Sequence, residues 1–150
     1  SYFGAGQYEM ASTTYDDFLK RFSTHPMRVA ADLGQAQCLE ATGQYEKALE
    51  DYDQLLKKNP DHYLAPLAVL GKGRCLEQLG RFDDAKAIYE DFAAAHPEST
   101  WAGHMKSAIL FADKRLRAQT EAPATTPTAP ALSLPETTTV PSPVLQPVTP

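Results

Sequence analysis

The feature that most constrains the fold is an internal repeat with a period of 37 residues. Segments 6–11, 43–48 and 80–85 each read Gly, any residue, an aromatic residue, any two residues and Ala. The same period relates three further sets: Tyr15, Tyr52 and Tyr89; Phe18, Leu55 and Phe92; and Cys38-Leu39-Glu40 with Cys75-Leu76-Glu77. A fixed period in this range is the signature of a protein built from stacked units.

Each unit reads as two helices joined by a turn. Glycine ends one helix, because it adopts a positive φ without a steric penalty. The aromatic residue begins the next helix, and the small Ala lets the two helices approach closely. His25-Pro26, Asn59-Pro60 and His96-Pro97 end the second helix, because a residue before proline avoids the α region. Such a unit cannot bury its apolar face alone and must stack on a neighbour.

These signals predict an all-α chain. The expected helices cover residues 7–23, 27–42, 45–58, 62–79, 82–95 and 99–119. We expect a helical repeat domain over residues 1–119, followed by a tail over residues 120–150.

The motif is similar to the tetratricopeptide repeat, whose usual period is about 34 residues. This chain departs from it with the longer period, and Pro26 comes three residues later than the period predicts. The resemblance covers residues 1–115 and implies a right-handed α-solenoid of about three helix pairs. Segments 25–31 and 96–102 also resemble bacterial envelope tetratricopeptide proteins, which implies an exported, periplasmic or cell-surface protein.

In tetratricopeptide proteins the first helix of each pair lines a concave groove that binds a peptide or another protein's helix. By this resemblance, the polar residues of the first helices are candidate groove contacts. A solvated helix face would carry the same residue types. The candidates are Gln37, Glu40, Arg74, Glu77 and Gln78.

The tail has a different composition from the rest of the chain. Residues 120–150 contain eight of the twelve prolines and no Lys, Arg or aromatic residue. At that density proline prevents helix and central strand, so we expect an extended, polyproline-II-like segment. It could serve as a spacer, as a glycosylated stalk, or as a ligand docked in a groove of its own or a neighbouring molecule. Candidate O-glycosylation sites are Thr125, Thr126, Thr128, Thr137, Thr138 and Thr139.

The position of the repeat within the chain leaves two helices without a partner. Ser1 aligns with Cys38, so the chain opens on a second helix and closes on a first helix. Either an upstream segment supplies the missing helix, or residues 99–119 of another copy do, which would build an end-to-end filament. Candidate end contacts are Tyr2, Phe3, Tyr8, Trp101 and Phe111.

Several functions are disfavoured by the sequence. A net charge of −5 argues against a nucleic-acid partner, and no apolar run is long enough to span a membrane. The four histidines lack ligand-type neighbours, and the two cysteines are expected to be buried small residues. Segment 71–74 reads Gly-Lys-Gly-Arg but lies in a helical pattern, which favours close packing over a phosphate loop.

No catalytic constellation emerges, and we expect neither an enzyme nor a cofactor. The sequence therefore predicts a scaffold or adaptor that binds a protein or peptide. The alternative is a structural subunit that binds other copies of itself in an extracellular filament.

Overall fold

The computed structural model describes residues 2–121, with the side chains of Tyr2, Phe3 and Ala5 left out. This part of the chain forms six helices and no strand. Two helices match the predicted ranges, and the others differ by one to five residues at an end. The helices are α1 (Tyr2–Arg21), α2 (Arg28–Ala41), α3 (Tyr45–Lys58), α4 (Ala65–Gln78), α5 (Phe82–Ala95) and α6 (Ala102–Glu121).

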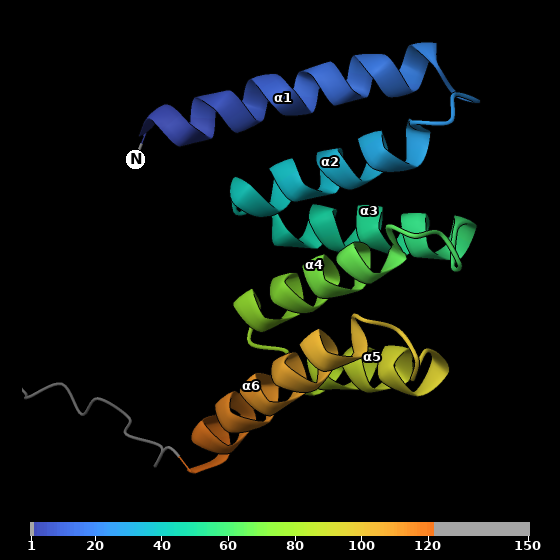
Figure 1. The fold of residues 1–150 in the computed structure, drawn as a ribbon. Coiled ribbons are helices and arrows are strands. Elements are labelled where there is room, and N and C mark those ends of the chain that lie inside the picture. The colour runs from blue at the N-terminus through green and yellow to red at the C-terminus, as the bar shows by residue number, and fades with distance from the viewer. Residues whose placement is uncertain (1, 122–150) are drawn as a thin grey trace, which may run out of the picture.

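Each helix packs against the next one along the chain, and successive helices run in opposite directions in an elongated stack (Figure 1). In addition, α2 contacts α4 directly. A curved stack brings the helices of its inner layer closest together, so α2 and α4 belong to the concave side. The predicted all-α solenoid of helix pairs is therefore confirmed.

Two glycines make the turns within the helix pairs. Gly43 follows α2 with φ 78° and Gly80 follows α4 with φ 74°. At the first turn the Gly43 N–H donates to the Glu40 carbonyl and the Gln44 N–H donates to the Leu39 carbonyl. These two bonds close the end of a helix in the Schellman arrangement. The sequence prediction for these two turns is confirmed.

The prediction for the first copy of the motif is wrong. Gly6 was expected to end a preceding helix, with the next helix beginning at residue 7. Instead α1 begins at Tyr2 and runs through Gly4 and Gly6 without a break. Neither of these glycines has a positive φ. Within the described residues Gly6 has no preceding helix to end, so the motif stands in a helix interior.

The residues before proline end the second helices as predicted. Asn59 and His96 leave the helical region, with φ −138° and −131°, and the helices before them end at Lys58 and Ala95. The first copy differs again, because α1 ends at Arg21, well before Pro26. The spacing of Pro26 already indicated this difference.

Tyrosines of the second helices pack against glycines of the first helices. An added Cβ on Gly34 of α2 would lie 2.5 Å from the ζ carbon of Tyr15. A Cβ on Gly71 of α4 would overlap the Tyr52 ring in the same way. Both pairs are 19 residues apart, so the contact repeats with the sequence. We call this arrangement the tyrosine–glycine contact.

The α4 helix takes tyrosines from both sides. Gly71 meets Tyr52 of the preceding helix, and a Cβ on Gly73 would overlap Tyr89 of the following helix. Both tyrosines are fully buried in the core cluster. The Gly-Lys-Gly-Arg segment thus serves close packing, as the sequence indicated.

The two cysteines lie on equivalent positions of α2 and α4. Both are buried free thiols, as expected. Burial raises the pKa of Cys75 to about 12, which keeps this thiol protonated and unreactive near neutral pH.

The tyrosine–glycine contact predicts opposite effects of two Gly→Ala changes. Gly71→Ala forces the buried Tyr52 ring to move, and we expect it to lower the free energy of unfolding by about 1–3 kcal/mol. Gly6→Ala meets no atom within 4 Å inside α1 and should raise it by up to about 1 kcal/mol. Urea unfolding followed by circular dichroism measures both. Equal effects of the two changes would contradict the contact.

Candidate functional site

A hollow of about 410 Å³ opens on the concave side, between the C-terminal halves of α2 and α4. Four of the five predicted groove residues line it together. Two tyrosines complete the wall: one at the start of α3 and one in the N-terminal half of α1. We call this surface the concave hollow, and it is lined by Tyr8, Gln37, Glu40, Ala41, Tyr45, Arg74 and Gln78.

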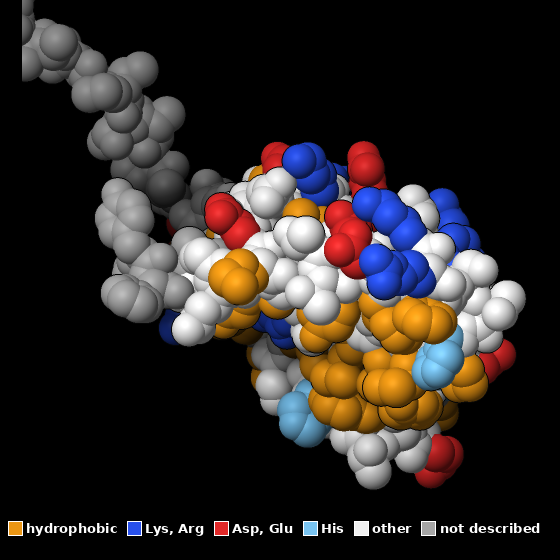
Figure 2. Space-filling model, turned by 90° about the horizontal axis from the view of Figure 1, so that it is seen from above, with side chains coloured by type: hydrophobic (Ala, Val, Ile, Leu, Met, Phe, Trp, Pro, Cys, Tyr) orange, Lys and Arg blue, Asp and Glu red, His pale blue; other side chains and the backbone are white. Residues whose placement is uncertain are grey.

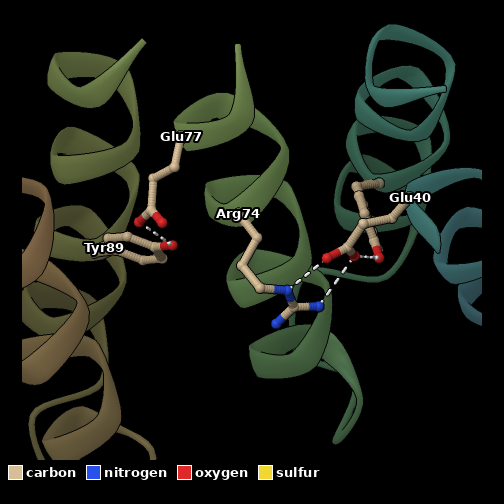
Figure 3. A network of polar contacts seen from close by, with 5 residues as sticks. Glu40, Arg74, Glu77 and Tyr89 are labelled. Carbon is tan, nitrogen blue, oxygen red and sulfur yellow. Dashed lines mark hydrogen bonds and ion pairs between the residues drawn. The ribbon is translucent and has the colours of Figure 1, made fainter. Parts of the chain in front are cut away.

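An ion pair spans the concave hollow from one first helix to the next. The Arg74 Nε and Nη2 atoms donate to the two carboxylate oxygens of Glu40 at 2.6 and 3.0 Å. Figure 3 shows the Arg74 guanidinium turned toward Glu40 and away from Glu77. A two-point bond of this kind fixes orientation as well as charge. The hydrogen bond to Glu40 is the main cause that raises the pKa of Arg74.

The glutamates Glu40 of α2 and Glu77 of α4 also accept a bond from the buried tyrosine of the same helix pair. The Tyr52 hydroxyl donates to Glu40 at 2.8 Å, and the Tyr89 hydroxyl donates to Glu77 at 3.1 Å. Burial is the largest cause that raises the pKa of both phenols, and the neighbouring glutamates add to it. Both hydroxyls therefore stay protonated as donors.

Glu77 does not line the concave hollow. Its carboxylate turns back to Tyr89 instead (Figure 3). Burial raises the pKa of Glu77, while Tyr89, Arg74 and Arg115 oppose this shift. We interpret Glu77 as a residue that holds the helix pair together.

Two aromatic residues of the concave hollow were missed as groove contacts. Tyr8 and Tyr45 are equivalent residues, the aromatic position of the Gly-x-aromatic motif. Sequence analysis assigned Tyr8 to the end contacts and gave Tyr45 no role beyond beginning a helix. Their shared motif position was the available signal, since residues at one repeat position face one side of a solenoid.

Of the other predicted end contacts, Trp101 and Phe111 belong to the C-terminal end of the described stack. Trp101 packs against the core cluster just before α6, and Phe111 is 52% exposed on α6. The side chains of Tyr2 and Phe3 lie outside the described residues. The six threonines proposed for glycosylation lie outside them as well, as does nearly all of the predicted tail.

An apolar hollow of about 260 Å³ lies at the α1 end of the stack. Viewed from that end, hydrophobic side chains gather in one patch, with histidine at its rim (Figure 2). Phe18, Phe22 and His25 extend the apolar surface, with ring centroids 5.0–5.9 Å apart. We call this the α1-end hollow, and it is lined by Thr14, Tyr15, Phe18, Met27, Ala30 and Ala31.

Metal chemistry finds no support in the part of the chain that the structure describes. No group of three or more His, Cys, Asp or Glu residues there could hold a metal ion. Two histidines act in turns: His25 Nδ1 accepts the Met27 N–H, and His62 Nδ1 accepts the Leu64 N–H. Among residues 2–121, no helix has the length and apolar character needed to cross a membrane.

Comparison with known families agrees with this architecture. A family model described as tetratricopeptide repeat matches residues 1–63 and again residues 41–100. The chain belongs to this family, whose repeats generally mediate protein–protein interaction. No curated protein matches the chain.

The position of Glu77 predicts an unusual pH dependence. Burial raises its folded-state pKa above the unfolded value, so the folded chain holds this proton more tightly. The contribution of Glu77 to stability therefore falls as the pH rises through the interval between the unfolded and the folded pKa. Glu77→Gln still accepts the Tyr89 bond and does not ionise.

As the pH rises from about 4 to about 7, we expect the free energy of unfolding of Glu77→Gln to increase by about 0.5 kcal/mol relative to that of the wild type. The gain is small because solvent screens this half-buried group. Urea unfolding at several pH values measures the difference. Glu98→Gln, at an exposed loop position, is the control. A relative loss of stability by Glu77→Gln over this interval would show that its carboxylate stabilises the fold.

Proposed function

We propose that this chain is a non-enzymatic scaffold or adaptor that binds a protein partner in the concave hollow. One observation carries the proposal. Gln37 and Gln78, on different first helices, line the same hollow as two tyrosines that repeat with the sequence. Side-chain amides and tyrosine hydroxyls bond to the backbone of an extended peptide, and tyrosine rings contact its apolar side chains.

The charge of the concave hollow limits the kind of partner. Arg74 is the cation of this surface, and Glu40 already neutralises it. The hollow therefore lacks the concentrated positive charge that would select a peptide by its carboxylates. We propose an extended segment with few charges, held mainly by backbone hydrogen bonds and contacts with Tyr8 and Tyr45.

We further propose that the partner belongs to a bacterial envelope. Segments 25–31 and 96–102 both begin with His-Pro and resemble envelope tetratricopeptide proteins, which supports this location. The Pro/Thr-rich composition after residue 120 is also common in exported proteins.

A pair of glutamine changes tests the concave hollow. The double variant Gln37→Ala/Gln78→Ala removes two polar side chains from the hollow and leaves the Glu40–Arg74 pair in place. We expect it to weaken capture of envelope partners at least tenfold, since each lost hydrogen bond contributes about 1 kcal/mol. Quantitative affinity purification from an envelope extract measures this loss.

The matched control is Gln44→Ala/Gln54→Ala, which removes two glutamines outside the concave hollow. It should retain the partners that bind the wild type. Equal capture by the two double variants would place the binding surface elsewhere. Enrichment of cytosolic proteins alone would contradict the envelope location.

The second candidate function is a structural subunit that joins end to end into an extracellular filament, with threonines of the tail glycosylated. The α1-end hollow favours it, because an exposed apolar surface commonly marks a contact site. The α6 helix argues against a simple continuation of the stack. At the position of Ala36 and Gly73 it carries Leu110, which leaves no small residue for a following tyrosine.

A methionine pair tests this second candidate. Met27 is 61% exposed and lines the α1-end hollow, whereas Met10 is 73% exposed on α1 outside it. If copies join through this hollow, light scattering should show assemblies of the wild type and of Met10→Glu, and mainly monomers of Met27→Glu. A monomeric wild type at all concentrations would rule out the filament and leave the adaptor proposal standing.

A further inference from the structure

A third hollow, of about 300 Å³, lies at the loops that join the helix pairs. It lies where the α3–α4 loop meets the end of α5 and the segment that leads into α6. It shares no lining residue with the concave hollow. We call it the aromatic hollow, and the residues that characterise it are Pro60, His62, Tyr63, Phe92, His96 and Trp101.

Rings of the aromatic hollow lie against one another in tilted pairs. The rings of His62 and Tyr63 have centroids 4.5 Å apart, and those of Phe92 and His96 are 4.8 Å apart. Tyr63 is nevertheless 77% exposed, so a large ring stands in solvent beside the hollow. Asp61 is the lining residue with a formal charge. Aromatic walls with little charge are the kind of surface that binds proline-rich segments in the polyproline II conformation.

We infer that the aromatic hollow binds the C-terminal end of this same chain, residues 140–150. This segment reads Val-Pro-Ser-Pro-Val-Leu-Gln-Pro-Val-Thr-Pro and carries no charge, which suits the hollow. Pro147 and Pro150 are three residues apart, and polyproline II has three residues per turn. In that conformation the two proline rings would lie on one face of the segment and could contact Tyr63 and Trp101 together.

The length of the chain after α6 allows this contact. The helix has 20 residues and is about 30 Å long, so the tail starts about that far from Trp101. A polyproline II chain extends about 3.1 Å per residue, and Pro147 lies 26 residues after Glu121. This stretch can span about 80 Å, well beyond the distance of about 30 Å back to Trp101. A similar pair, Pro127 and Pro130, lies only six to nine residues after Glu121 and reaches about 19 to 28 Å in the same conformation, less than the length of α6.

Attachment to the same chain makes a weak contact effective. A tethered segment presents itself at an effective concentration on the order of 1 mM, so the hollow is largely occupied even if the free peptide binds weakly. The bound tail covers Tyr63 and shields this aromatic surface from other chains. The proposal is independent of any partner of the concave hollow, because the two surfaces are separate.

Trp101 reports on the aromatic hollow, because it is the chain's one tryptophan and lines that surface. The test compares acrylamide quenching of its fluorescence in the full wild-type chain, in Pro147→Ser/Pro150→Ser and in Pro127→Ser/Pro130→Ser. We expect the distal double variant to raise the quenching constant about twofold, as release of the tail exposes the ring. The proximal double variant, with the same chemical change, should match the wild type.

Both variants change residues beyond α6, and circular dichroism should confirm an unchanged helix content. Identical quenching in all three proteins would overturn the proposal. A quenching constant of the wild type that stays constant on hundredfold dilution supports a contact within one chain. A rise on dilution to the value of the distal variant would instead assign the hollow to the tail of another copy and overturn the proposal as stated.

Discussion

The structure depends on the repeated contact between a tyrosine ring and a glycine backbone. Tyr15 packs on Gly34, and 37 residues later Tyr52 packs on Gly71. Only a residue without a Cβ lets the ring lie against the helix backbone at this distance. The contact therefore sets the spacing at the α1–α2 and α3–α4 junctions. The same pair recurs at these two junctions, so one local rule of side-chain packing shapes both, whereas Ala108 stands at the equivalent position of α6.

The polar end of the same tyrosine connects the core to the concave side. The Tyr52 hydroxyl donates to Glu40, and Glu40 in turn binds Arg74 of the next pair. A ring that fixes helix spacing thus also orients the ion pair within the concave hollow. Gln37 and Gln78 lie beside this ion pair and can bond to a ligand. The candidate binding surface is a direct consequence of how the helices pack.

The sequence predicted the repeat helices best where both ends carried a backbone signal. Segments 45–58 and 82–95 lie between a positive-φ glycine and a pre-proline residue, and both matched. The starts after Pro60 and Pro97 were placed early, because short turns with bonds such as His62 N–H to the Asn59 carbonyl precede the helices. Four of the residues that line the concave hollow are among those that the resemblance to the family singled out on the first helices. The Glu40–Arg74 pair was not predicted, because it joins residues 34 apart and depends on side-chain rotamers that no local pattern encodes.

Amide hydrogen exchange of the Tyr52→Ala variant tests most directly whether the tyrosine ring holds neighbouring helices together. Tyr63→Ala, which removes an exposed ring of the same size, is its control. Our account predicts faster exchange in α2 and α4, the two first helices that Tyr52 contacts, with a smaller change in α6. Exchange in α2 and α4 no faster than in Tyr63→Ala would contradict the account.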